Sequence, residues 1–400
     1  MTALDTDPAE FGHAPVQDKP RIVVKVGSSL LANSPDLRPR YAFMHGLLGD
    51  IAQLRDRGFE VVLASSGSVA LGLNALRSDS ERAGIQEKQA AAACGQIVLL
   101  NAYKQVAQEY GFDIAQVLVT LDDLEDRRRF LNTKNTVHKL LELGILPIVN
   151  ENDTITTEEI RVGDNDRLAA KVGQMIQAQH LVILTSVDGL YDRNPSEPGA
   201  KLIDRVEDVS EYLAVTSGTD SLGTGGMFTK MQAANMAQNA GCETLISRGI
   251  LDEPITAALE NRRPHTRCIA KSTPQSAWAV WLTDRLQMAG SLVLSQSAAD
   301  ALEKGEGEVA CTDVITIHQA FQKADVLHIY DERGVERARG LSNFSSDEAA
   351  LIACNPERTI RDLLGYQAEA TLVNRKNLVI LEDHHLPWDE PEQKFRVIAA

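Results

Sequence analysis

Short apolar runs alternate with longer amphipathic segments over the first two thirds of the chain. The β-branched run at 22–26 predicts a strand, and the apolar positions between 43 and 54 recur at helical spacing until Gly58, which fits a helix C-cap. The same alternation predicts these further elements in chain order: strand 59–64, helix 87–109, strand 114–119, helix 133–143, strand 145–149, helix 168–177 and a strand from 181. Strands separated by helices of this length predict a mainly parallel sheet covered on both faces.

Polar residues follow four of these expected strands at the points where the strands end. The segments are 25–29, 64–68, 150–153 and 185–189, and all carry small, hydroxylated, amide or carboxylate side chains. In an open parallel sheet, ligands bind beyond the carboxyl ends of the strands. The pattern therefore predicts a polar ligand site at one edge of the sheet.

The pattern changes after residue 262. Residues 263–289 contain two prolines and two tryptophans without clear alternation, which indicates a connecting segment with one packed stretch. Short β-rich pieces then dominate 290–381, at 314–317, 326–329, 371–373 and 378–381, and predict a small β-rich second domain. We expect a first domain at 20–262, a disordered tail at 1–19 and a further tail at 382–400.

Composition narrows the class of protein. With 400 residues, 44% apolar and 24% charged, the chain can bury a large core and exceeds what one core usually organises. Its net charge of −16 disfavours nucleic acid, and residues 290–400 hold 11 Lys or Arg against 19 Asp or Glu. The sequence has no apolar stretch long enough to span a bilayer, so we expect no membrane partner. Its five cysteines are widely spaced and form no C-x-x-C pair, which suits a cytoplasmic protein.

A glycine-rich loop runs directly into an Ala-rich helix at 223–230, with the sequence G-T-G-G-M-F-T-K. Loop glycines let backbone N–H groups approach an anion, and a helix start adds unpaired donors, so the segment suits phosphate. It lacks the Walker A spacing, and a plain turn before a helix would look the same. Lys230 in the first helical turn opposes the helix dipole, a conflict that a phosphate would resolve.

Other polar residues offer the partners that phosphoryl transfer to an amino acid needs. Lys25 lies inside a β-branched strand, where an ammonium needs an anionic partner or must extend along the strand edge to water. Asp164, Asn165 and Asp166 precede a helix and could cap it, orient lysines or hold Mg²⁺ through water. Asn150 and Asp153 could bind an ammonium, and Ser66 and Gly67 a carboxylate; each group could equally cap its own loop.

Taken together, these motifs resemble the amino acid kinase family, most closely its glutamate 5-kinase branch. The match runs in order through residues 21–250, and its most specific strings are N-E-N-D at 150–153, V-G-D-N-D at 162–166 and G-T-G-G-M-F-T-K at 223–230. The resemblance implies a three-layer α/β/α sandwich that phosphorylates the γ-carboxylate of L-glutamate with ATP, the first step of proline biosynthesis. Residues 290–381 resemble the PUA domain appended to that branch.

The resemblance also implies roles for single residues. Lys25 and Lys230 would stabilise the transferring phosphoryl group, Asp164 or Asp166 would orient them, and Mg²⁺ would bridge the phosphates without a protein metal site. Glutamate would be bound by Ser66, Gly67, Asn150, Asp153 and Asn165. ATP would be bound by Lys25, Gly27, Ser28, Thr185, Ser186, Thr224, Gly225, Gly226, Met227, Phe228, Thr229 and Lys230, although Ser186 stands where the family usually has aspartate.

The resemblance further implies a homo-oligomer and feedback inhibition by proline. Two alternatives to a glutamate kinase stay open at this point. One is a kinase for another small acid, such as acetylglutamate or aspartate. The other is an inactive RNA-binding or regulatory relative, against which the intact lysines and the acidic C-terminal region argue.

Overall fold

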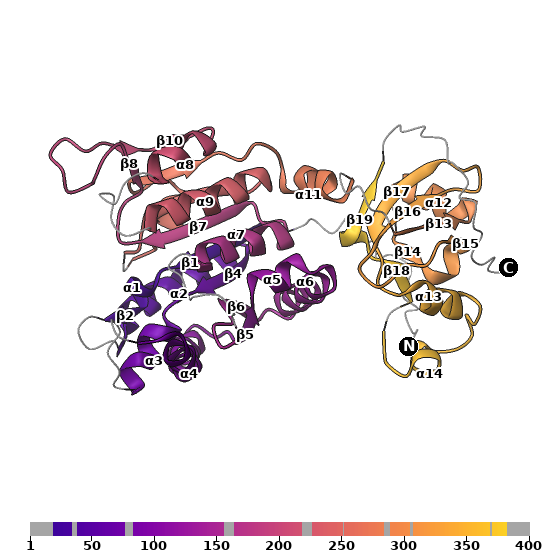
Figure 1. The fold of residues 1–400 in the computed structure, drawn as a ribbon, viewed down its shortest axis with the longest axis horizontal. Coiled ribbons are helices and arrows are strands. Elements are labelled where there is room, and N and C mark those ends of the chain that lie inside the picture. Colours follow the sequence, from indigo (N-terminus) through magenta and orange to yellow (C-terminus); the bar gives the residue numbers. More distant parts are fainter. Residues whose placement is uncertain are drawn as a thin grey trace, which may run out of the picture.

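The computed structural model of the chain describes residues 19–33, 38–76, 83–155, 164–217, 226–250, 252–283, 289–304, 307–368 and 370–381. Within these ranges the chain forms a larger α/β domain and a smaller β-rich domain, joined through helix α11 (Pro274–Thr283) (Figure 1). The expected N-terminal tail, apart from Lys19, and the tail at 382–400 lie outside the described residues. No described helix combines the length and the apolar character needed to cross a bilayer.

The larger domain is built on a sheet that has eight strands among the described residues. Its order is β10 (Arg205–Val206), β12 (His265–Cys268), β11 (Glu243–Arg248), β7 (His180–Thr185), β1 (Arg21–Val26), β4 (Glu60–Ser65), β6 (Leu146–Glu151) and β5 (Ile114–Val119). Neighbouring strands run parallel except for the pair β11 and β12. The expected mainly parallel sheet is therefore confirmed.

Apolar residues on both faces explain why these segments form strands inside two helical layers. Along β1 every residue is buried, with Ile22 and Val24 facing one core and Val23 the other. One face is covered by α2 (Tyr41–Asp56), α3 (Ser68–Leu76), α4 (Ile85–Glu109) and α10 (Thr256–Leu259). The other is covered by α5 (Leu121–Glu125), α6 (Arg127–Glu142), α7 (Asp164–Ile176), α8 (Ser210–Ser217) and α9 (Gly226–Asn239). The three-layer sandwich is confirmed.

Helix α6 and strand β12 differ most from the sequence prediction, and helix α7 begins at Asp164 rather than at 168, so that residues 164–166 form its first turn instead of preceding it. Helix α6 begins at Arg127 rather than at 133, because the Asp126 side chain accepts a hydrogen bond from the Arg129 backbone N–H and caps the helix. The segment expected only to connect the domains supplies strand β12, which pairs antiparallel with β11. A four-residue strand with one polar and one basic side chain at its centre carries too little alternation to be recognised from its sequence.

Small elements complete the description of the larger domain. The short helix α1 (Ser28–Leu31) follows β1, and two further strand pairs are formed by β2 (Ala32–Asn33) with β3 (Arg38–Pro39) and by β8 (Leu190–Tyr191) with β9 (Leu202–Ile203). The ends of β1, β4, β6 and β7 lie at the same edge of the sheet because these strands are parallel neighbours.

The C-terminal domain is a second, separate β structure. Its five-stranded sheet has the order β15 (Val314–His318), β13 (Gly290–Leu294), β16 (Val326–Tyr330), β17 (Glu336–Leu341) and β19 (Leu378–Ile380), and β14 (Val309–Ala310) pairs with β18 (Thr371–Val373). Its helices are α12 (Gln296–Glu303), α13 (Ser346–Ala353) and α14 (Ile360–Leu364). A core of its own, which includes Leu292, Phe321 and Phe344, supports the expected β-rich domain.

A buried lysine joins the two domains. The ammonium of Lys134, on α6, lies 3.9 Å from the ring centroid of Trp278 and donates to Asn377 Oδ1 at 2.8 Å and to the Lys376 carbonyl at 3.2 Å. Lys134 is 1% exposed, and Trp278 of α11 stacks on Phe130, which lies on α6 with Lys134. Burial, followed by the charges of Arg21 and Lys376, lowers the pKa of Lys134 to about 7.

This junction makes stability depend on pH. Between about pH 7 and the usual lysine pKa near 10.5, the unfolded chain keeps a proton that the folded Lys134 has lost, so the free energy of unfolding rises with pH. We expect Lys134→Met to remove a slope of at most about 1.4 kcal/mol per pH unit. Urea unfolding of both proteins between pH 7 and 9 tests this, because the difference between them cancels the other titrating groups. Parallel stability curves over that range would contradict it.

Candidate active site

Two lysines from distant parts of the chain meet on one buried carboxylate at the carboxyl edge of the sheet. Lys25, near the end of β1, places its ammonium 2.6 Å from Asp166 Oδ1, and Lys230, in the first turns of α9, places its ammonium 3.3 Å from Asp166 Oδ2. All three residues are nearly buried, at 5%, 1% and 9% exposure for Lys25, Asp166 and Lys230. Two cations around one anion leave an excess positive charge, which suits an anionic ligand.

The cluster is held together electrostatically. Burial lowers the pKa of the Lys25 ammonium, the negative charge of Asp166 opposes that effect and the positive charge of Lys230 adds to it. Burial alone would raise the pKa of the Asp166 carboxyl, but the charges of both lysines and hydrogen bonds from Lys25 and Thr229 outweigh it and hold that pKa below its usual value. Asp166 is therefore an anion that fixes two cations.

The start of α9 supports the same cluster. The Thr229 hydroxyl donates to Asp166 Oδ2 at 2.9 Å, and the Lys230 ammonium donates to the Gly226 carbonyl at 3.0 Å. Thr229 was predicted only as a nucleotide-binding residue, and its contact with Asp166 depends on the packing of α7 against α9. The preceding residues of the glycine-rich loop, including Thr224 and Gly225, lie outside the described residues, as do Val162, Gly163 and the side chain of Asp164.

A second polar group lines the end of β6. Asn150 is fully buried and donates from Nδ2 to Gln96 Oε1 at 2.8 Å and to Ser68 Oγ at 3.4 Å, while its Oδ1 accepts from the Glu151 backbone N–H. Ser68 in turn donates to Asp153 Oδ2 at 3.2 Å. Asn150 and Asp153 are among the site residues predicted from the sequence. Ser68 and Gln96, which join them to α3 and α4, are not.

Asn165 ties this group to the lysine cluster. Its Oδ1 accepts a hydrogen bond from the Glu151 backbone N–H at 3.2 Å, so the first turn of α7 is fastened to the end of β6 next to Asp166. The adjoining ends of β1 and β4 are also linked, because the Ser66 backbone N–H donates to the Val26 carbonyl at 3.2 Å. Gly67 has a φ of +103°, a conformation that favours glycine, and Gly27 and Ser28 begin the short helix α1.

The opposite side of the lysine cluster is formed by the end of β7. Thr185 is half-buried there, and Ser186 is exposed. Met227 and Phe228 are half-buried in the first turn of α9. Beyond them, Arg248 at the end of β11 grips Asp188 with two bonds of 2.7 and 3.1 Å, a contact between strand ends that the sequence alone did not indicate.

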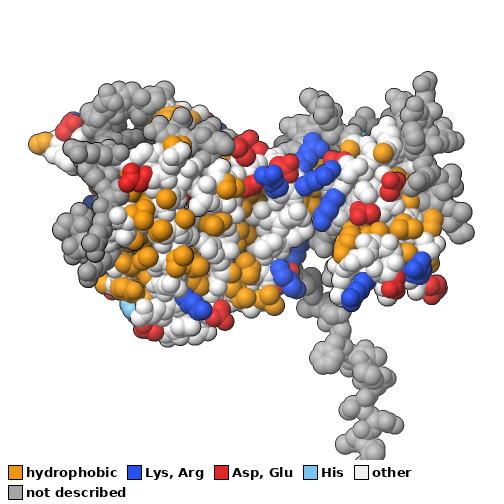
Figure 2. Space-filling model, turned by 60° about the horizontal axis from the view of Figure 1, so that its bottom comes forward, with side chains coloured by type: hydrophobic (Ala, Val, Ile, Leu, Met, Phe, Trp, Pro, Cys, Tyr) orange, Lys and Arg blue, Asp and Glu red, His pale blue; other side chains and the backbone are white. Residues whose placement is uncertain are grey.

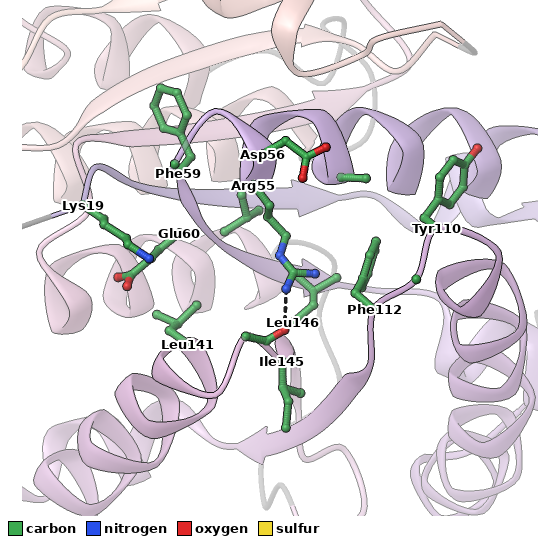
Figure 3. Close-up of a pocket in the computed structure, with 15 residues that line it drawn as sticks. Lys19, Arg55, Asp56, Phe59, Glu60, Tyr110, Phe112, Leu141, Ile145 and Leu146 are labelled. Carbon is green, nitrogen blue, oxygen red and sulfur yellow. Dashed lines mark hydrogen bonds between the residues drawn. The ribbon is translucent and has the colours of Figure 1, made fainter. Parts of the chain in front are cut away.

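A separate cavity of about 310 Å³ lies at the opposite edge of the sheet, where the strands begin (Figure 3). The Arg55 guanidinium stacks 4.6 Å from the ring centroid of Phe112 and donates to the Gly144 carbonyl. These contacts join the last turn of α2 to the turns that follow α4 and α6. Since ligands of open parallel sheets bind at the carboxyl edge, we assign this cavity a structural role.

Comparison with known proteins agrees with this geometry. Residues 20–247 match the model of the amino acid kinase family, and residues 290–364 match the PUA domain. The glutamate 5-kinase of Bartonella henselae is 38% identical, covering 90% of this chain and 95% of that protein. Those of an Azoarcus species and Cereibacter sphaeroides are 41% and 40% identical, covering 91% of this chain and 99% and 98% of theirs. The family model thus covers the domain with the buried lysines at its carboxyl edge, and the PUA match covers the β-rich domain that follows it in the sequence. The chain therefore belongs to the glutamate 5-kinase branch of the amino acid kinase family.

Proposed function

We propose that the protein transfers the γ-phosphoryl group of ATP to the γ-carboxylate of L-glutamate, forming L-glutamyl 5-phosphate and ADP, the first step of proline biosynthesis. The observation that carries this proposal is the buried cluster of Lys25, Asp166 and Lys230 in a member of this family. The substrate carboxylate oxygen attacks phosphorus while the bond to the ADP oxygen breaks, so no protein nucleophile is needed. Catalysis then depends on positioning and positive charge.

The two lysines lie where they would neutralise charge that spreads over the phosphoryl oxygens in the transition state. Asp166 keeps both ammonium groups in place before substrates bind, so little reorganisation accompanies the reaction. The start of α9 directs backbone N–H groups to the same region and suits the ATP phosphates. We assign Gly27, Ser28, Thr185, Ser186 and the segment 224–230 to nucleotide binding.

Magnesium fits this site as a companion of ATP. Both carboxylate oxygens of Asp166 face lysines, so that carboxylate already has cationic partners within the protein. Mg²⁺ usually keeps several waters and binds substrate phosphates. Bound to the phosphates of ATP, it would supply further charge neutralisation.

The group around the end of β6 provides the glutamate subsite in this proposal. Asp153 is 8% exposed and its carboxylate suits the substrate ammonium, while Ser66 and Gly67 suit a carboxylate. Asn165 lies between this subsite and the lysines. Asn150 is fully buried with protein partners on both ends of its amide, so we assign it to supporting Asp153 rather than to contacting glutamate.

A hydroxamate assay tests the proposed function directly. Hydroxylamine traps an acyl phosphate as a hydroxamate, so ATP-dependent product with L-glutamate is expected, with N-acetylglutamate and L-aspartate giving far less. Reactions without ATP and without Mg²⁺ serve as controls. Absence of turnover with L-glutamate, or preferred turnover of either other acid, would reject the proposal.

Further partners follow from the same proposal. We expect L-proline to compete with L-glutamate and to raise its KM without changing kcat, which steady-state kinetics would measure.

We expect the protein to be cytoplasmic and to form a homo-oligomer. The oligomer is expected because large apolar side chains of the larger domain are exposed, such as Ile97 on α4 at 66% and Leu118 on the edge strand β5 at 39%. Figure 2 shows hydrophobic side chains gathered on this domain. Sedimentation of a monomer at micromolar concentration would contradict the oligomer.

We expect the protein not to bind RNA, because its C-terminal domain is acidic. In a gel mobility-shift assay, the protein should leave the mobility of RNA unchanged.

A further inference from the structure

We propose that Ser68 and Gln96 are positioning residues that set the affinity for the amino acid substrate by orienting Asp153 through Asn150. This inference rests on the proposed function, because it takes the group at the end of β6 as the substrate subsite. Asp153 is 8% exposed and Gln96 is half-buried, whereas Ser68 and Asn150 between them are 3% and 0% exposed, so these two can act on the substrate only through their partners.

The direction of each hydrogen bond in this group is determined by the chemistry of its atoms. The Asn150 amide nitrogen carries two hydrogens, and it donates one to Gln96 Oε1 and the other to Ser68 Oγ. Because Ser68 Oγ already accepts from Asn150, its single hydrogen is directed to Asp153 Oδ2. The hydrogen-bond chain thus begins at Gln96, which accepts from Asn150. Asn150 also donates to Ser68, and Ser68 donates to the Asp153 carboxylate.

The satisfied amide of Asn150 makes this chain rigid. Its Oδ1 accepts the Glu151 backbone N–H at 2.9 Å, so both hydrogens and the oxygen of the side chain have protein partners. A buried amide group that loses a hydrogen-bond partner is destabilised, because no water replaces that partner. The side-chain orientation that satisfies all three groups is therefore favoured over the others. Gln96 thus holds the amide in the orientation that offers a hydrogen to Ser68.

A close crossing of two helices brings Ser68 to this position. A Cβ atom added at Gly95 of α4 would lie 1.8 Å from the Ser68 carbonyl, and one added at Gly72 of α3 would lie 1.7 Å from the Ala91 carbonyl. The backbones of α3 and α4 therefore touch in a way that only glycine allows at both positions. This contact places Ser68, in the first turn of α3, within reach of Asn150 and Asp153.

Two single variants test the proposal in the full-length protein. Ser68→Ala removes the donor to Asp153, and Gln96→Met removes the acceptor for Asn150 while keeping a similar length. We expect each to raise the KM for L-glutamate about 5- to 10-fold, with kcat and the KM for ATP within about twofold of wild type. In the double variant the rise should fall short of the product of the single effects, because both changes break one chain.

Gln105→Met is the matched control, since Gln105 is exposed on the same helix and should leave both KM values unchanged. Wild-type turnover of L-glutamate, measured first by the hydroxamate assay, separates failure of this inference from failure of the proposed function. With that turnover present, an unchanged KM for L-glutamate in both single variants would overturn the inference. An equal rise in both KM values would also overturn it, because general loosening of the fold affects both substrates.

Discussion

Replacement of Lys230 by methionine is expected to lower kcat about 10²- to 10³-fold while the KM for L-glutamate changes by less than about threefold. Lys230 is 9% exposed, its ammonium is held by Asp166 and the Gly226 carbonyl, and it lies near the start of the helix assigned to the phosphates. Its charge matters most when negative charge spreads over the transferring group, so its loss raises the barrier more than it weakens ground-state binding. Initial rates of hydroxamate formation over a range of glutamate concentrations measure both constants.

Lys104→Met provides the control for this variant, because Lys104 is exposed on α4 and makes no contact with the lysine cluster. Its kcat should equal that of the wild type. An unchanged kcat in Lys230→Met would remove that lysine from the mechanism. A large increase in the KM for L-glutamate at constant kcat would instead assign Lys230 to substrate binding.

Asp166→Asn is expected to have the largest effect on stability, lowering the free energy of unfolding at pH 7 by about 3 kcal/mol. The substitution keeps the shape of the side chain but leaves the buried ammonium groups of Lys25 and Lys230 without an anion. In the wild type, Asp166 has a lowered pKa in the folded state, so its contribution is present above the pKa of the unfolded carboxyl and is lost as pH falls through the folded value. As the pH is lowered from about 5, the free energy of unfolding should therefore fall less in the variant than in the wild type.

Urea unfolding without nucleotide measures this change, and Asp188→Asn is the matched control. Asp188 also lies at the carboxyl edge and pairs with Arg248, but the Arg248 side chain is 51% exposed. Loss of that pair should cost less than about 1 kcal/mol. Equal losses in the two variants would show that the burial of the lysine cluster does not determine its contribution.

Strands β1, β4, β5, β6 and β7 of the main sheet followed from the pattern of apolar positions along the chain, but strand β12 did not. Strand β1 lies within one residue of its predicted range of 22–26, because residues buried on both faces of a parallel sheet form a continuous apolar run in the sequence. The early start of α6 carried a local signal in the capping Asp126. Strand β12 carried none, since its place depends on an antiparallel neighbour supplied by the rest of the fold.

The sequence by itself determined which residue types would meet at the carboxyl edge, because parallel strands bring their ends together wherever they lie in the chain. It thus predicted Lys25, Asp166, Lys230, Asn150 and Asp153 as neighbours of a ligand. Only the tertiary structure decided which of the two candidate aspartates is seen between the lysines, that Ser68 and Gln96 direct a hydrogen bond to Asp153, and that Lys134 lies buried between the domains. The reason is physical: burial, donor direction and the close crossing of α3 and α4 arise from contacts between segments far apart in sequence, which no local pattern encodes.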